Sequence, residues 1–92
     1  RQMIMRRFDT NRVFDRMFKK LPRDVRDRFV ERAELFIKDH RHPLLRDHAL
    51  TGAWAGHRSI NVTGDYRAVY EEVAADTFRF VAIGTHHDLY GA

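Results

Sequence analysis

The spacing of apolar residues changes once along this chain, and that change restricts the fold to one that combines helices with a sheet. Between residues 10 and 39, apolar side chains recur every three or four positions, which is typical of amphipathic helices. From residue 57 onward they recur at every second position, which is typical of strands with one buried face. Together, the two halves predict an α+β domain.

The first half predicts a short strand over residues 3–8 and a helix over residues 10–20. Asp9 or Thr10 is expected to cap this helix, because a short side-chain oxygen can accept hydrogen bonds from the free amides of the first turn. The residues expected on its inward face are Val13, Phe14, Met17, Phe18 and Leu21.

A second helix is predicted over residues 22–39. Pro22 suits its first position, where the missing N–H costs no hydrogen bond, and His42-Pro43 is expected to end it. The residues expected to face inward are Val25, Phe29, Ala33, Phe36 and Ile37.

Three strands are predicted in the second half, over residues 57–62, 66–73 and 78–84. A three-residue first loop pairs Val62 with Tyr66, whereas a two-residue turn would set apolar residues beside polar ones, so the longer loop is preferred. It gathers on one face Ile60, Val62, Tyr66, Ala68 and Tyr70, and on the other His57, Ser59, Asn61 and Arg67.

The second loop, residues 74–77, pairs Val73 with Phe78 if it is four residues long. In that register Val81 and Ile83 join the apolar face opposite Tyr70 and Ala68, and Gly84 falls beside Arg67.

The predicted fold class is therefore α+β: an N-terminal strand, two packed helices, then an antiparallel sheet of hairpins. The helices are expected to cover one face of the sheet. The other face is expected to be polar, cationic and histidine-bearing, and open to solvent or to a ligand.

Length and composition fit one domain over residues 1–92, since 92 residues with 43% hydrophobic side chains can form a single core. The chain has no cysteine, which excludes disulfides, thiolate metal sites and a thiol nucleophile. It contains no apolar run of the ~20 residues that span a bilayer. A cytoplasmic protein without a membrane partner is expected.

The charges are distributed unevenly. Residues 1–46 hold 14 Lys or Arg and 7 Asp or Glu, whereas residues 47–92 hold 3 and 6. Most of the cations are arginine, whose planar guanidinium suits phosphate. The basic half indicates a polyanionic partner, nucleic acid first. The alternative is a solvated helix surface with pairs such as Arg23–Asp27.

Histidine is the residue type with the clearest potential for acid–base chemistry near neutral pH. The six are His40, His42, His48, His57, His86 and His87. The first two suit a helix end, where the dipole favours a cation. Adjacent histidines on an extended segment point in opposite directions, and no His-x₃-His pair or carboxylate cluster is present, so neither a metal site nor a cofactor is expected. A serine elbow and a phosphate-binding glycine loop are also missing.

Three motifs, in this order, carry a resemblance to a known family. They are Asp47-His48-Ala49-Leu50-Thr51-Gly52-Ala53-Trp54, Gly64-Asp65-Tyr66-Arg67-Ala68-Val69-Tyr70, and Ile83-Gly84-Thr85-His86-His87-Asp88-Leu89-Tyr90-Gly91. Together they resemble the RelE/ParE toxin superfamily, and most closely its YafQ-like branch, found in bacterial type II toxin–antitoxin systems. The resemblance covers roughly residues 44–91, and the strand–helix–helix opening agrees with it in layout.

This resemblance implies a metal-independent endoribonuclease that cleaves mRNA, typically on the ribosome, and a cognate antitoxin protein that silences it. In such chemistry a ribose 2′-OH attacks the adjacent phosphate. One side chain accepts the proton, another protonates the leaving 5′-oxygen, and cations stabilise the developing charge.

The resemblance implies five catalytic residues. His48 is the candidate base, His86 the candidate acid, and Arg67 the cation beside the phosphate. Asp65 is expected to orient an imidazole or a base, and Tyr90 to stack on a nucleobase. Each has an ordinary alternative: a loop histidine, a surface histidine, an ion pair of Arg67 with Glu71, a turn aspartate and a C-terminal anchor on the core.

RNA-binding roles are implied for His57, Asn61 and Tyr66. The register argument makes Tyr66 a core residue instead. Asn61 and Ala82 depart from the family pattern, which has a histidine and an arginine at these positions. Because asparagine cannot transfer a proton, His57 and Arg67 are the residues expected to compensate.

Two alternatives from other classes remain at this point. One is a ParE-like toxin that inhibits a protein target such as DNA gyrase without catalysis. The other is a plain RNA- or DNA-binding module, which explains the basic half but not the histidine-bearing motifs late in the chain.

Overall fold

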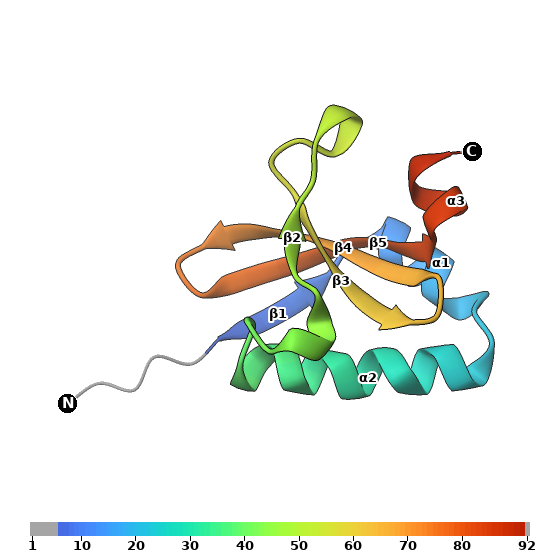
Figure 1. Ribbon diagram of the computed structural model, residues 1–92, viewed down its shortest axis with the longest axis horizontal. Helices are drawn as coiled ribbons and strands as arrows, with labels where there is room; N and C mark the ends of the chain where they lie inside the picture. Colours follow the sequence, from blue (N-terminus) through green and yellow to red (C-terminus); the bar gives the residue numbers. More distant parts are fainter. Residues whose placement is uncertain (1–5, 92) are drawn as a thin grey trace.

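The computed structural model describes residues 6–91 and has an α+β architecture, as the sequence predicts (Figure 1). A five-stranded sheet has the order β1-β5-β4-β3-β2. The strands are β1 (Arg7–Thr10), β2 (His48–Ala49), β3 (Arg58–Thr63), β4 (Tyr66–Ala74) and β5 (Thr77–Thr85); the helices are α1 (Arg12–Lys19), α2 (Arg23–Lys38) and α3 (His86–Tyr90); and short 3-10 turns are η1 (Pro43–Leu45) and η2 (Gly52–Trp54). None of these helices is long and apolar enough to cross a membrane.

The late strands β3, β4 and β5 pair antiparallel, as predicted, and β1 adds an unexpected parallel pairing with β5 that makes the whole sheet mixed. The two helices carry the chain away from β1, and β5 then returns beside it, which places the last strand in the interior of the sheet. The first strand occupies Arg7–Thr10. The predicted strand at residues 3–8 lies partly outside the described residues.

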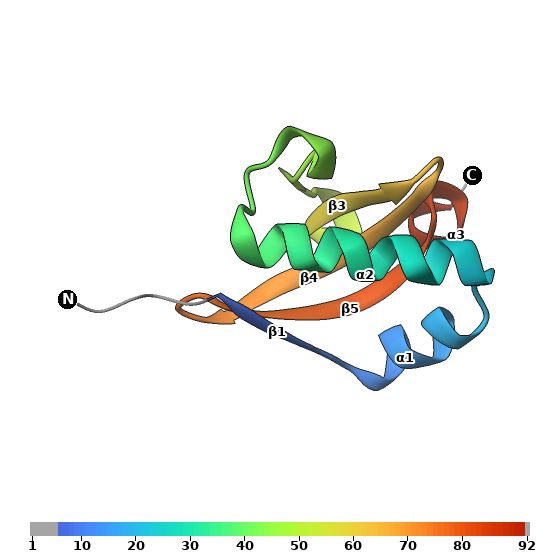
Figure 2. The ribbon, with the colours of Figure 1, turned by 90° about the horizontal axis from the view of Figure 1, so that it is seen from below.

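Helix α2 crosses one face of the sheet and supplies most of the helical side of the core (Figure 2). Its buried residues are Val25, Phe29, Ala33 and Phe36, as predicted, whereas Ile37 is only half-buried. Pro22 precedes the helix as its N-cap residue, and the helix ends at Lys38, before His42-Pro43. Phe80 of β5 meets the rings of Phe29 and Phe36 at centroid distances of 5.2 and 5.7 Å.

Helix α1 packs against β5, and its cap lies one residue after Thr10, the later of the two predicted caps. Asn11, not Asp9 or Thr10, accepts a hydrogen bond from the backbone N–H of Phe14 at 2.8 Å. The two expected caps are in β1, where Asp9 pairs with Arg79 instead. Phe14 is buried, but Val13, predicted to face inward, is 45% exposed.

The β3–β4 register agrees with the prediction except beside the turn. Ile60 pairs with Ala68 and Asn61 with Arg67, as expected. At the turn Thr63, not Val62, pairs with Tyr66, and a bulge between Asn61 and Thr63 absorbs the difference. The chain thus has a tight turn, with Gly64 at φ +51°, and also the register that buries the apolar residues. The prediction considered only a two-residue or a three-residue loop without a bulge, so it did not include this combination.

The β4–β5 register changes halfway along the strands. Ala68 pairs with Ile83 and Arg67 with Gly84, as predicted, but Tyr70 pairs with Phe80 and not with Val81. Val81 therefore packs on the opposite face, with Val69 and Ala82. The predicted pairing of Val73 with Phe78 is also wrong: Glu72 pairs with Phe78, and Val73 is 41% exposed.

The second face of the sheet is not the open polar surface that was expected. A small apolar cluster of Val69, Val81, Ala82 and Leu89 covers part of it. In Figure 1, α2 lies below the sheet, whereas the loop containing η2 and helix α3 rise above it. His86 and His87 were expected on an extended segment, but residues 86–90 form helix α3. These two segments enclose a pocket on this face.

Candidate active site

Four of the predicted catalytic side chains line one pocket. His48, Arg67, His86 and Tyr90 surround a cavity of about 460 Å³, together with Leu50 and Thr51. They come from β2, β4 and α3, so the fold joins three segments that are distant in sequence. The pocket combines two imidazoles, one guanidinium and one phenol ring.

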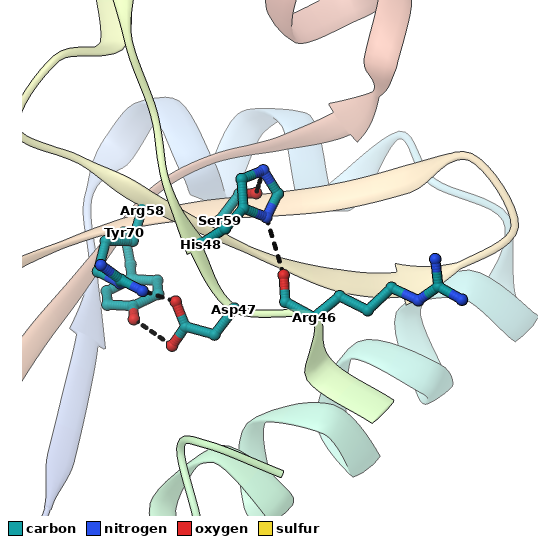
Figure 3. Close-up of polar contacts among 6 residues, drawn as sticks. All are labelled: Arg46, Asp47, His48, Arg58, Ser59 and Tyr70. Atoms are coloured by element: carbon teal, nitrogen blue, oxygen red, sulfur yellow. Dashed lines mark hydrogen bonds and ion pairs between the residues drawn. The ribbon is translucent and has the colours of Figure 1, made fainter. Parts of the chain in front are cut away.

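His48 lies on β2 in a defined orientation. In the sheet it pairs with Ser59 of β3. Its Nδ1 lies 2.8 Å from the backbone oxygen of Arg46, and because a carbonyl can only accept, Nδ1 must carry the proton (Figure 3). In the neutral ring, Nε2 then carries the lone pair and makes a long hydrogen bond of 3.5 Å with the hydroxyl of the buried Ser59. This is the form of histidine that can accept a proton.

Arg67 lies half-buried on the pocket face of β4. Its guanidinium donates to the side-chain oxygen of Asn61, the residue opposite it in the sheet, and to the carbonyl of Gly64 at 3.3 Å. Neither partner is a carboxylate, and in residues 6–91 the expected alternative, an ion pair of Arg67 with Glu71, is not formed. The charge of Arg67 thus remains available to an anion.

Helix α3 presents both His86 and Tyr90, whose ring centroids lie 4.7 Å apart in an edge-to-face arrangement. Thr85 and Asp88 form a reciprocal capping box at its start, with bonds of 3.0 and 3.1 Å. The bonds from Thr85 hold the pKa of the Asp88 carboxyl below its usual value. The hydroxyl of Tyr90 is buried without a hydrogen-bond partner.

Trp54 connects the two walls of the pocket, and the sequence analysis assigned it no role. Its indole N–H donates to the carbonyl of Leu89 at 2.9 Å, which ties the η2 loop to α3. His57 packs edge-to-face on the Trp54 ring at 5.3 Å and does not line the pocket. Trp54 ends the first of the three sequence motifs, and that position was the signal that could have indicated its role.

The remaining predicted residues lie around this pocket or beneath it. Asp65 is an exposed turn residue, and its backbone oxygen accepts a hydrogen bond of 3.1 Å from the backbone N–H of His86. Tyr66 is half-buried and packs against the main core, as the register argument expected. Ala82, where the family pattern has an arginine, is 2% exposed in the second apolar cluster.

A polar network behind His48 was also not anticipated. The side chain of Asp47, 7% exposed, accepts hydrogen bonds from Arg58 at 2.8 Å and from the hydroxyl of Tyr70 at 2.5 Å (Figure 3). Burial and the bond to Asp47 raise the pKa of the Tyr70 hydroxyl above its usual range. The bond to Asp47 likewise raises the pKa of Arg58.

Comparison with solved structures reveals the same fold in several toxins. YafQ from E. coli strain BL21(DE3) matches with a TM-score of 0.76 and 22% identity, over 94% of this chain and 99% of that one. YafQ in the E. coli DinJ–YafQ toxin–antitoxin complex matches with a TM-score of 0.76 and 24% identity, over 96% and 100%. The archaeal RelE–RelB complex from Pyrococcus horikoshii OT3 matches with a TM-score of 0.70 and 17% identity, over 89% and 96%.

Sequence comparison defines the family. No curated protein sequence gives a match. The family model described as the bacterial toxin of type II toxin–antitoxin system, YafQ, however, matches residues 6–91, almost the whole chain. The chain therefore belongs to the YafQ family of toxins of bacterial type II toxin–antitoxin systems.

Proposed function

We propose that this toxin is a metal-independent endoribonuclease that cleaves mRNA on the ribosome, in the cytoplasm. The observation that carries the proposal is the convergence of His48, Arg67, His86 and Tyr90 on one pocket. Two imidazoles and a cation are sufficient to catalyse attack of a 2′-OH on the neighbouring phosphate.

In the proposed reaction, Nε2 of His48 accepts the proton of the 2′-OH as its oxygen bonds to phosphorus. The bond from phosphorus to the 5′-oxygen breaks, and protonated His86 gives its proton to that oxygen. The products are a 2′,3′-cyclic phosphate and a free 5′-OH. The geometry at His48 supports its role as the base, because in the neutral ring the hydrogen bond to Arg46 places the proton on Nδ1 and the lone pair on Nε2.

Arg67 is proposed to stabilise the charge that develops on the phosphorane, with Asn61 holding its guanidinium in place. Tyr90 is proposed to stack on a nucleobase, and Asp65 to orient the imidazole of His86, whose backbone it already contacts. Contacts of Tyr66 and His57 with RNA have less support, because Tyr66 packs against the core and His57 against Trp54.

We also propose a cognate antitoxin as partner. Two of the matching toxin folds were solved as complexes, DinJ–YafQ and RelE–RelB. The basic half of this chain, with 14 Lys or Arg among residues 1–46, suits an acidic antitoxin segment that folds on contact, or ribosomal RNA.

The test is cleavage of a labelled mRNA by translating ribosomes, with wild type and Arg67→Ala. Loss of a charge-stabilising donor should reduce cleavage by about 10²–10³-fold. Arg79→Ala is the matched control, because Arg79 is an arginine of β5 that pairs with Asp9 and does not line the pocket. Equal activity in Arg67→Ala and wild type would remove Arg67 from the mechanism. No cleavage by wild type, with inhibition of gyrase supercoiling, would favour the ParE-like alternative.

A further inference from the structure

The network of Asp47, Arg58 and Tyr70 lies on the opposite face of the sheet from the catalytic pocket. Arg58 and Tyr70 are a cross-strand pair on the face that α2 covers, next to the pair of Ile60 and Ala68. Asp47 bridges them with one carboxylate oxygen each. A cavity of about 600 Å³ opens beside this network and does not include His48.

The backbone connects the network to the imidazole through a single peptide unit. The carbonyl that accepts Nδ1–H of His48 is that of Arg46, and it belongs to the peptide bond between Arg46 and Asp47. Arg46 itself has φ +46°, a left-handed conformation that non-glycine residues rarely adopt and that the surroundings must maintain. Because the Cα of Asp47 ends this peptide unit, anchoring the Asp47 side chain restricts how far the peptide and its carbonyl can turn.

We infer that Asp47, Arg58 and Tyr70 are positioning residues that keep His48 in the Nδ1–H form by fixing the Arg46–Asp47 peptide. The inference rests on the proposed function for its catalytic meaning. It gives the aspartate of the Asp47-His48 motif a structural role. Its carboxylate is hydrogen-bonded on the helix side of the sheet, and on the pocket side the imidazole of His48 donates to the carbonyl of the Arg46–Asp47 peptide.

Removing the negative charge of Asp47 should therefore change which nitrogen of the His48 ring carries the proton, although Asp47 does not contact that ring. In Asp47→Asn the amide cannot accept from Arg58 and Tyr70 with a full negative charge, so the Arg46–Asp47 peptide gains freedom to rotate. We expect a mixture of His48 tautomers. We also expect kcat for mRNA cleavage to fall by about 10–100-fold with little change in KM, since a misplaced base costs chemistry more than binding.

The first readout is the ¹⁵N NMR spectrum of the His48 ring in the free, full-length chain, which distinguishes Nδ1–H from Nε2–H without any RNA. Asp9→Asn is the matched control, because Asp9 bridges β1 to Arg79 of β5 with a similar distance of 2.9 Å but away from His48. The control should keep the wild-type His48 spectrum and the wild-type pH–rate profile.

A second variant, Tyr70→Phe, keeps the core ring and removes one hydrogen bond, so it answers the question if Asp47→Asn does not fold. An unchanged tautomer and pH–rate profile in either folded variant would overturn the inference. So would a wild-type spectrum with the proton on Nε2, whatever the variants do. If the tautomer shifts but wild type cleaves no RNA, the proposed function fails and the positioning role remains.

Discussion

At the scale of single residues, the two histidines of the pocket are held in different ways that suit different roles. His48 is tied by Nδ1 to a backbone carbonyl. His86 is exposed at the start of α3 and rests edge-on against Tyr90. Both rings are exposed, so exposure does not distinguish them; the difference is that the bond to Arg46 fixes the direction of the His48 ring, which suits a group that accepts a proton.

This difference predicts which limb of the pH–rate profile each residue controls. With a base and an acid of this kind, kcat/KM should follow a bell-shaped curve. His48→Gln should remove the rise on the acidic side, His86→Gln the fall on the basic side, and each should lower the rate by about 10²–10⁴-fold. Single-turnover cleavage measured across pH checks this.

His87→Gln is the matched control for these two variants. His87 neighbours His86 and is exposed like it, but it does not line the pocket. Its replacement should leave the profile unchanged. If His48→Gln and His86→Gln lose the same limb, the assignment of base and acid is wrong.

At the scale of elements, α3 is the part of the site that the sequence reading missed. The segment that carries His86 and His87 was expected to be extended, yet Thr85 and Asp88 have the spacing of a capping box, which is a signal for a helix start. The helix turns His86 and Tyr90 toward the same pocket. Its five residues are too few for apolar periodicity to reveal it.

The strand registers show what a pattern can and cannot predict. Alternation correctly paired Asn61 with Arg67 and Arg67 with Gly84, which is why Arg67 was placed on the pocket face. It missed the irregularities near Val62 and Val81, because a bulge adds one residue to one strand and leaves no mark in composition. It also could not show the Asp47 network, which depends on side chains from three strands or loops meeting in space.

The start of α3 predicts an effect of Gly84→Ala. A Cβ on Gly84 would lie 3.0 Å from both Cβ and Oδ2 of Asp88, which is fixed by the capping box. Asp88 would have to leave the cap, which should lower the free energy of unfolding. We expect mRNA cleavage to fall further than this suggests, because His86 and Tyr90 both shift. Urea unfolding and cleavage assays on the variant test the two effects separately, and unaltered cleavage would contradict the prediction.

The same cap predicts a pH effect on α3. The pKa of Asp88 is lowered by its hydrogen bonds with Thr85, so its stabilising effect is present above the ordinary value of 3.8 and is lost as the pH falls through the lower folded value. The Thr85 amide resonance should therefore titrate with a midpoint below 3.8. Asp88→Asn should abolish this titration. A midpoint at or above 3.8 in the folded protein would contradict the cap.

At the scale of the whole molecule, the described part of the basic half, residues 6–46, contains β1, α1, α2 and η1, whereas the pocket is built from the second half. If the chain binds RNA through arginines, its affinity for an uncleavable single-stranded RNA should fall steeply with salt. Each phosphate contact adds about 0.7 to the slope of log affinity against log salt. Arg67→Ala should reduce the slope by about one contact. A flat salt dependence in a binding titration would speak against an RNA ligand.

The stability of the molecule depends strongly on Phe80, a fully buried residue of β5. Its ring meets Phe8, Phe29 and Tyr70 at 5.3, 5.2 and 5.5 Å. Phe80→Ala should lower the free energy of unfolding by about 3–5 kcal/mol, a large part of what a small domain has. Val73→Ala, at a 41% exposed position of the same hairpin, should change it by no more than about 0.5 kcal/mol. Urea denaturation of both variants measures the two changes in the free energy of unfolding and tests this prediction.

The parallel pairing of β1 with β5 has a consequence for synthesis. Phe8 cannot meet Phe78 until 70 further residues have been made, so the sheet of the nascent chain lacks an interior strand until residues 77–85 have been made. His86 and Tyr90 follow that strand. The pocket needs His86 and Tyr90 as well as His48 and Arg67, so it forms only after β5 and α3 have both been made, and the folding order delays the action of the proposed nuclease.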